Sequence, residues 1–272
     1  MKTLARFAAQ AIFLSILFHG FESLGADKKF PFTPAAKPQA KTPPAAPATV
    51  GAMRQTVSAA ERFYWARVKF KAHSNQGGQW DGDPFGDVFF LRTLRERTNI
   101  QVDEDWYAAD LNKIDELVKF PILFMTSDPG FTLPENQLAN LKEYLERGGF
   151  IFADDCVWNE RNPPGDYFFK SYQALIEKMF NTAMVKLPDD HEIYHCLYDM
   201  PNGLPHMQGT PHGGWALFLN GRMVTFLSPS DLHCGWSSHH LLITGGRPWF
   251  PKEKSDLALK MGINIIVYAM TH

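Results

Sequence analysis

The stretch Gly-Gly-Phe-Ile-Phe-Ala-Asp-Asp-Cys, residues 148–156, joins an apolar run of strand length to two carboxylates and a thiol. A short apolar run bounded by glycines and polar residues is typical of a buried strand in a parallel sheet. Ligands of open α/β sheets bind beyond the carboxyl ends of the strands. We therefore expect a strand over Phe150–Ala153 and a candidate site at Asp154 and Asp155.

The chain before and after this stretch alternates strand-like and helix-like segments. Strands are expected at Tyr64–Phe70, Ile100–Val102 and Phe120–Thr126, and helices at Asp87–Thr98, 132–147 and Asp166–Phe180. Thr132 and Glu135 have the spacing of a capping box, which favours a helix start there. Strands that alternate with helices of this length predict a parallel sheet with helices on both faces.

The second half of the chain is less regular. Two expected strands, Trp215–Leu219 and Arg222–Leu227, are joined by Asn-Gly at 220–221, a strong hairpin signal. The second strand leads into Ser-Pro-Ser-Asp-Leu-His-Cys-Gly-Trp, residues 228–236, which we interpret as a second site loop. Apolar residues at helical spacing over Ser255–Tyr268 predict a closing helix.

The first 26 residues have the order of a secretory signal. Lys2 and Arg6 precede the apolar stretch Phe7–Phe18, and small residues follow it up to Gly25 and Ala26. The alternative is an uncleaved membrane anchor, but the apolar stretch is shorter than the roughly 20 residues that a spanning helix needs. We expect cleavage and export to a periplasmic or extracellular space.

Residues 27–59 are rich in Pro, Ala, Lys and Thr and are expected to form a flexible linker, because repeated proline favours extended backbone and few large apolar residues are present. Residues 60–272 then form one domain of ordinary size. The formal net charge of −2 argues against nucleic acid as a partner, since binding to a polyanion needs a clustered basic surface.

Four stretches together resemble the bacterial family known as domain of unknown function 4159. They are residues 148–156, residues 228–236, Gly-Ile-Asn-Ile-Ile-Val-Tyr-Ala at 262–269 and the loop around Trp80 and Asp83-Pro84. That family is similar to ThuA-like proteins and thereby to class I glutamine amidotransferase-like proteins. The resemblance implies a single flavodoxin-like α/β domain with a mostly parallel sheet.

By position, the resemblance places Asp154 where amidotransferases keep a nucleophilic cysteine, and Asp231 or His233 near the amidotransferase histidine. A carboxylate cannot form a thioester with glutamine, so glutamine hydrolysis is disfavoured. Asp154, Asp155, Asp231 and His233 are instead candidate catalytic residues for acid and base chemistry. Adjacent carboxylates repel, which raises one pKa or attracts a cation. The alternative is that these aspartates only cap helices or brace turns.

Histidines suggest a metal but do not identify one. The second half of the chain contains, among others, His191, His195, His206, His212, His233, His239 and His240. The segment His191-Glu192-Ile-Tyr-His195 matches the His-Glu-x-x-His pattern of zinc proteases, in which both histidines share one helical face. No third ligand is evident, so a zinc protease is a minor alternative to ordinary packing histidines.

The chain has three cysteines, so any pairing leaves one over. Cys156 and Cys234 each follow a strand that is expected to end at the same edge of the sheet, and an oxidising compartment would let them bridge. We predict that disulfide, with Cys196 as a free, buried thiol. The alternative is that Cys156 or Cys234 is a reactive thiol near His233.

Two classes of function remain open. Tryptophans in glycine- and proline-rich loops near carboxylates, as at 80, 158, 215, 236 and 249, are typical platforms for sugar rings, which favours a hydrolase or a carbohydrate-binding protein. The alternative is a non-catalytic binding or scaffold module of a cell-envelope assembly. An open pocket lined by the four candidate residues would favour the enzyme, and a buried, fully paired Asp154 would favour the scaffold.

Overall fold

A computed structural model describes residues 40–41, 62–73, 79–157 and 165–272. The expected signal segment and most of the expected linker lie outside the described residues. Of the linker, Ala40 and Lys41 are described, and Lys41 forms a parallel bridge with Tyr107. Among the described residues, no helix combines the length and the apolar character that crossing a bilayer requires.

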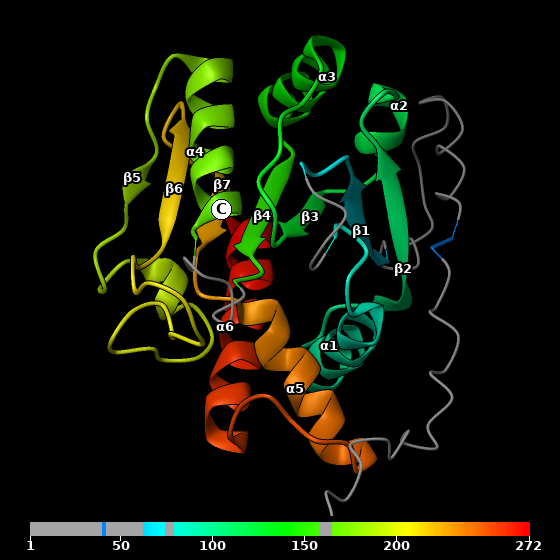
Figure 1. Cartoon of the computed structure of the whole chain (residues 1–272), viewed down its shortest axis with the longest axis vertical. Helices are drawn as coiled ribbons and strands as arrows, with labels where there is room; N and C mark the ends of the chain where they lie inside the picture. The colour runs from blue at the N-terminus through cyan, green and yellow to red at the C-terminus, as the bar shows by residue number, and fades with distance from the viewer. Residues whose placement is uncertain (1–39, 42–61, 74–78, 158–164) are drawn as a thin grey trace, which may run out of the picture. The chain divides into compact units, whose positions relative to one another are not determined.

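Seven strands form one sheet in the order β2-β1-β3-β4-β7-β6-β5 (Figure 1). They are β1 Phe63–Lys69, β2 Val102–Asp110, β3 Ile122–Ser127, β4 Phe150–Asp155, β5 Val185–Lys186, β6 Trp215–Leu219 and β7 Arg222–Ser228. The first five strands in that order pair in parallel, whereas β6 is antiparallel to both β7 and β5. The prediction of an α/β fold with a mostly parallel sheet is confirmed.

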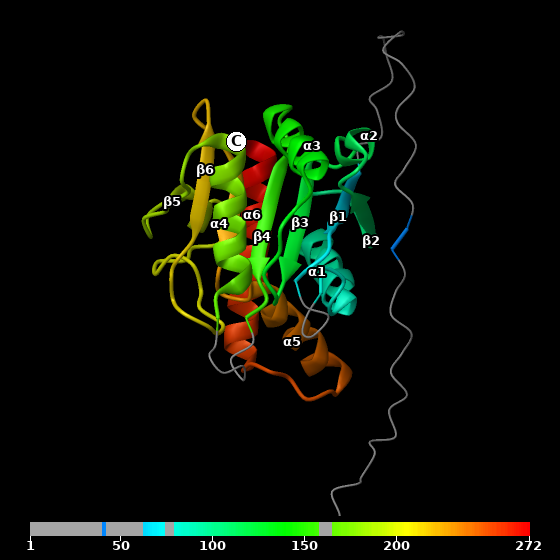
Figure 2. The same cartoon turned by 45° about the horizontal axis from the view of Figure 1, so that its top comes forward.

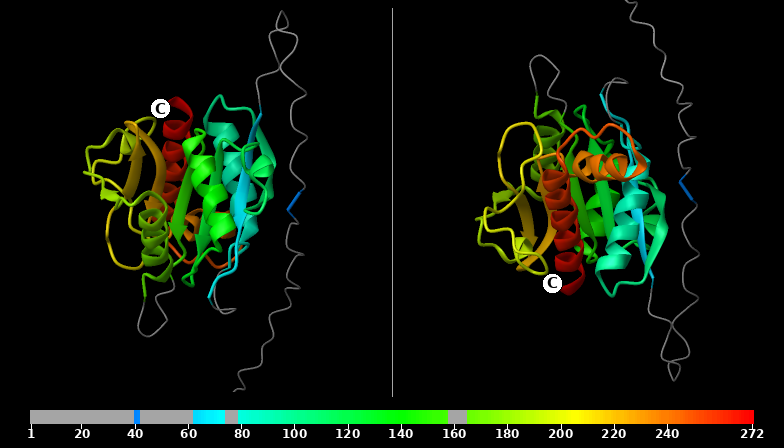
Figure 3. Two further views of the ribbon diagram at one scale, coloured as in Figure 1. Left: turned by 90° about the horizontal axis from the view of Figure 1, so that it is seen from above. Right: turned by 90° about the horizontal axis from the view of Figure 1, so that it is seen from below.

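Helices cover both faces of the sheet. One face carries α1 Pro84–Arg97, α5 Leu232–Thr244 and α6 Lys252–Thr271, which Figure 3 (right) shows side by side. The other face carries α2 Ile114–Leu117, α3 Glu135–Glu146 and α4 Tyr167–Phe180, and Figure 2 shows α4 alongside β4 with α3 toward the upper ends of β3 and β4. A single 3-10 turn, η1, spans Glu192–Tyr194.

Alternation along β4 divides its side chains between the two cores. Phe150 and Phe152 pack with α1, α5 and α6, whereas Ile151 and Ala153 pack with α3 and α4. Strands buried on both faces read as continuous apolar runs because neither face meets solvent. This is why residues 150–153 are a strong strand signal in the sequence.

Two local predictions are wrong. The strand predicted at Ile100–Val102 is the nine-residue edge strand β2, whose acidic side chains at 103–105 mask its strand character in the sequence. The residue before α3 is Pro134 rather than Thr132, and the Thr132 hydroxyl lies 3.2 Å from His73 Nε2. The predicted hairpin is confirmed, with left-handed φ values of 52° at Asn220 and 81° at Gly221.

The segment predicted as a second site loop is largely helical. Helix α5 begins at Leu232, directly after Asp231, which adopts a left-handed φ of 59° and accepts a hydrogen bond from the Cys234 amide. The helix ends before Gly245, another left-handed residue. An Asp before the helix and a Gly after it are the usual N- and C-terminal signals, so the sequence contained the information that was overlooked.

The α5–α6 contact admits no additional atom at Gly235. A Cβ built there would lie 2.3 Å from the Ala258 Cβ, which is fixed to the α6 backbone. We expect Gly235→Ala to lower the free energy of unfolding by about 1 to 3 kcal/mol through overpacking, although alanine is the better helix former.

The matched measurement is a double-mutant cycle with Ala258→Gly, followed by urea denaturation. Ala258→Gly alone costs about 1 kcal/mol of helix propensity, and in combination with Gly235→Ala it removes the clash. Additive losses in the double variant would show that the two positions do not collide.

Candidate functional site

Asp154 at the end of β4 is bound to the first turn of α5. Asp154 pairs with Ser228 across the β4–β7 register, so the chain leaving β7 enters α5 beside it. The Oδ1 atom of Asp154 accepts a hydrogen bond from the Leu232 amide at 3.1 Å, and Oδ2 accepts one from the His233 amide at 2.8 Å. The side chain is fully buried. Asp154 thus satisfies two amides that the helix itself leaves unpaired.

Asp231 lies next to Asp154 and is also fully buried. Its carboxylate accepts from the Cys234 amide at 3.4 Å and from the side-chain amide of Gln208, which donates as well to the Val157 carbonyl at 2.5 Å. Burial raises the pKa of Asp231 to about 6. Burial, and then the nearby charge of Asp231, raises the pKa of Asp154 well above its ordinary value.

Asp155 belongs to the opposite face of the sheet, because successive strand residues point to opposite sides. Its Oδ2 atom accepts a hydrogen bond from the Phe169 amide at 2.9 Å, at the start of α4. Its Oδ1 atom is buried with no hydrogen-bond partner among the described residues, and burial raises the pKa of Asp155 well above its ordinary value. Asp154 and Asp155 therefore brace two different helices and do not converge on one point.

His233 is in a buried network with Arg67 and Asp87, two residues that the sequence analysis did not select. Nη2 of Arg67 lies 2.7 Å from Nε2 of His233, and 2.9 Å from an Asp87 oxygen. A guanidinium can only donate, so Nε2 of His233 accepts and the ring carries its proton on Nδ1. His233 therefore accepts a hydrogen bond from a fixed cation.

The guanidinium of Arg67 has an acceptor for each of its five N–H groups. Nε and Nη2 donate to the two oxygens of Asp87, and the second Nη2 hydrogen to His233. Nη1 donates to the carbonyls of Trp80 at 3.0 Å and Gly82 at 2.6 Å. A complete set of acceptors is what allows an arginine to be fully buried.

Asp87, in the first turn of α1, supplies the countercharge. Burial by itself would raise the pKa of Asp87, but the Arg67 charge and the hydrogen bonds that Arg67 donates outweigh it and hold that pKa below its ordinary value. The signal for this pair was present in the sequence. Arg67 follows Phe63 and Trp65 at the inward positions of a strand, where a charge requires a buried partner.

The two cysteines predicted to pair are adjacent but not bonded. The Sγ atoms of Cys156 and Cys234 are 3.7 Å apart, whereas a disulfide bond measures about 2.05 Å. Both are free thiols in the structure, so the predicted disulfide is not formed in it. The hydrogen bond with Cys234 lowers the pKa of the Cys156 thiol, but burial and nearby carboxylates raise it to about 12. Cys196 is a third, separate thiol, with its Sγ 3.3 Å from the Asn264 carbonyl.

The His191-Glu192-x-x-His195 segment does not form a zinc-protease helix. It is a single 3-10 turn, and Nδ1 of His191 accepts the Ile193 amide as its N-cap. Nδ1 of His195 is 2.6 Å from Asp199, and its Nε2 is 3.0 Å from the Asp189 carbonyl. Both nitrogens of His195 are thus engaged within their own loop. The expectation that the two histidines share a helical face is wrong.

The tryptophans that the structure describes do not form one exposed aromatic surface. Trp236 is fully buried and stacks on Phe90 at a centroid distance of 4.5 Å. Trp80 packs edge-on against Trp106, and Trp249 is exposed near the end of α5. Trp158 lies outside the described residues. Trp236, Trp80 and Trp249 therefore form no common platform for a sugar ring.

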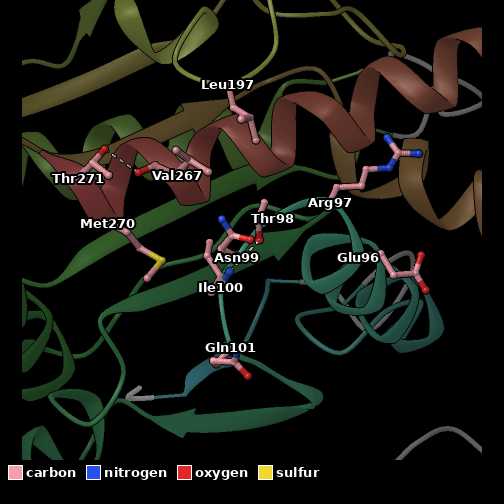
Figure 4. Close-up of a pocket in the computed structure, with 10 residues that line it drawn as sticks. All are labelled: Glu96, Arg97, Thr98, Asn99, Ile100, Gln101, Leu197, Val267, Met270 and Thr271. Atoms are coloured by element: carbon pink, nitrogen blue, oxygen red, sulfur yellow. Dashed lines mark hydrogen bonds between the residues drawn. The ribbon is translucent and has the colours of Figure 1, made fainter. Parts of the chain in front are cut away.

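All four candidate residues are buried, and none of them lines either of two grooves in the described part of the chain. A groove of about 690 Å³ lies between the end of α1 and the end of α6, with Leu197 and Met270 on its rim (Figure 4). A second groove, of about 560 Å³, is lined by the loop 199–207, Lys186, Ser230 and residues of α6. The second groove adjoins the carboxylates, because Ser230 directly precedes Asp231.

Because Arg67 and Asp87 are both buried, we expect an isosteric change of Asp87 to lower the free energy of unfolding strongly. Asp87→Asn keeps the shape but leaves the buried guanidinium without a countercharge, so we expect a loss of about 3 to 5 kcal/mol in the free energy of unfolding at pH 7. Glu104→Gln is the control. It removes the same charge from surface pairs with Arg92 and Arg95 and is expected to cost about 1 kcal/mol or less.

The same variant has a pH signature. The folded-state pKa of Asp87 lies below 3.8, so its stabilising effect is complete above pH 3.8 and is lost as the pH falls through the lower folded value. In urea denaturation from pH 7 down to pH 3, we therefore expect the free energy of unfolding of the wild type to approach that of Asp87→Asn. A constant difference between them over this range would contradict an ionised Asp87.

Comparison with known proteins places the chain in a family. Residues 65–270 match the family described as a domain of unknown function (DUF4159), and this match includes Arg67, Asp87, Asp154 and the start of α5. No curated protein matched the chain. Since the match covers most of the chain, this protein belongs to the DUF4159 family.

Proposed function

We propose that this protein is an exported, non-catalytic ligand-binding module of a cell-envelope assembly, built on a flavodoxin-like, ThuA-like domain. The observation that carries the proposal is the state of Asp154. An acid or base must reach the proton that it transfers. Asp154 is fully buried, and both of its oxygens accept hydrogen bonds from α5 amides. This geometry favours a structural role for the predicted catalytic carboxylate.

The strand order supports the flavodoxin-like part of the proposal. Taken along the sheet, the five parallel strands are the second, first, third and fourth of the chain, followed by β7. Flavodoxin-like sheets have the order 2-1-3-4-5, with their ligand beyond the carboxyl ends of the strands. The segment 185–219, which contains β5, η1 and β6, is in this view an insertion before the fifth parallel strand.

The groove next to Ser230 is the place that we propose for the ligand. Its volume of about 560 Å³ falls within the roughly 300–1,000 Å³ that small-molecule sites occupy. Its lining combines apolar side chains, such as Met200 and Leu257, with charged groups from Lys186, Asp189 and Asp199. A mixed lining of this kind suits a carbohydrate or another small polar molecule.

Stability measurements test the structural role of Asp154. Asp154→Ala leaves the Leu232 and His233 amides without their hydrogen-bond acceptor, and we expect the free energy of unfolding to fall by about 2 kcal/mol or more. Asp115→Ala, on the exposed turn α2, is the control and is expected to change little. Equal stability of Asp154→Ala and wild type would remove the main support for the proposal.

Ligand binding is tested with a panel of neutral and acidic mono- and oligosaccharides, using calorimetry for binding and product analysis for turnover. We expect binding without product, weakened about tenfold or more by Lys186→Ala through the loss of a charge-assisted hydrogen bond. Lys178→Ala, an exposed lysine on α4, is the matched control. Product formation that Asp154→Asn abolishes in a folded variant would instead identify a hydrolase.

A further inference from the structure

Three potential metal ligands converge where β4 ends and α5 begins. The Sγ atoms of Cys156 and Cys234 and a carboxylate oxygen of Asp231 all lie within 4.8 Å of one another. Within the described ranges this is the single group of three or more such residues. None of the three is part of the groove that we propose for the ligand.

The spacing of the sulfurs fits a shared ion. Two thiolates on a tetrahedral zinc ion, each at about 2.3 Å from the metal, are about 3.8 Å apart. The observed distance between the Sγ atoms is 3.7 Å. The sulfurs therefore need almost no movement to bind one ion, whereas a disulfide requires them to approach by more than 1.5 Å, as the bonded distance is about 2.05 Å.

The surrounding structure holds the three side chains in place. The Cys156 amide donates to the Ser127 carbonyl at 3.3 Å, which fixes the turn after β4. Cys234 lies in the first turn of α5, which begins at Leu232, so its position is set by the same helix start that Asp231 caps. Gln208 donates to Asp231 from outside the cluster, as partners of metal-binding carboxylates commonly do.

We propose that Cys156, Cys234 and Asp231 bind one thiophilic divalent cation, zinc by preference, with the fourth position open to water or to a ligand. Two sulfur–metal bonds form, the two thiol protons pass to solvent, and Asp231 contributes one oxygen. Cysteine sulfur and carboxylate oxygen are both ligands that zinc accepts in proteins. Cys156 is the only one of the three that is partly exposed, so it marks the side from which the ion enters. This site does not depend on the proposed binding of a carbohydrate.

Cobalt(II) is the probe, because it replaces zinc and its absorption reports thiolate bonds and tetrahedral geometry. The full-length protein is reduced, freed of metal and titrated with cobalt, and the bound cobalt is then displaced with zinc. We expect one cobalt per chain with sulfur-to-cobalt charge-transfer absorption. Cys156→Ala and Cys234→Ala should each abolish this absorption, and Cys196→Ala, which removes the third thiol, should preserve it.

Asp231→Asn provides a second measurement if a cysteine variant fails to fold. Asparagine retains an N-cap oxygen and tolerates the left-handed backbone, so α5 should persist, while affinity for zinc should fall about tenfold or more. Absence of stoichiometric cobalt binding in reduced, folded wild type would overturn the proposal. So would a spectrum unchanged by all three ligand variants. Alkylation of the unreduced protein shows whether Cys156 and Cys234 form a disulfide instead. If they do, and the protein binds no cobalt after reduction, the proposal is overturned.

Discussion

A permanent positive charge in the core sets the arrangement of the carboxyl edge of the sheet. Arg67 is fully buried in β1 and cannot lose its proton, so every one of its donors needs an acceptor. Those acceptors come from α1, from the loop before α1 and from α5. One side chain thus ties residues 80–87 and the start of α5, 166 residues away, to the first strand of the sheet.

Asp154 makes the complementary connection from the centre of the sheet. It holds the first amides of α5 from one side while Arg67 holds His233 from another. The start of α5 is therefore fixed by two buried polar contacts as well as by the packing of Gly235 and Trp236. Carboxylates at the carboxyl edge of a sheet are in the usual position of an active site. Here Asp154 instead accepts hydrogen bonds from the first amides of a helix.

The same helix start also brings the two thiols and Asp231 together. Whether that cluster holds a metal or oxidises depends on the compartment, since thiols in oxidising environments tend to bridge. A bound ion would use the two sulfurs at nearly their present separation. Ser230, which lines the second groove, directly precedes Asp231 of this cluster. Metal binding or oxidation at the two sulfurs would therefore take place close to a ligand bound in that groove.

Local patterns in the sequence determined the elements whose signal is contained in one segment. The apolar run of β4, the hairpin at Asn220-Gly221 and the periodicity of α4 were each predictable, because burial on both faces, a turn with positive φ and an amphipathic helix leave a local trace. The extent of the acidic edge strand β2 and the whole of helix α5 were not predicted, because the acidic residues 103–105 and the mixed sequence at 228–236 resemble loops when their partners are unknown.

The site was decided by the tertiary structure. The sequence marked Asp154, Asp231 and His233, but the partners of His233 are Arg67, 166 residues away, and Asp87. Alternation along β4 sends Asp155 to the α4 side, although it is adjacent to Asp154 in the chain. Residue types alone therefore indicated where polar side chains gather. Only packing decided whether they face solvent or one another, because the burial of a charge depends on segments that meet after folding.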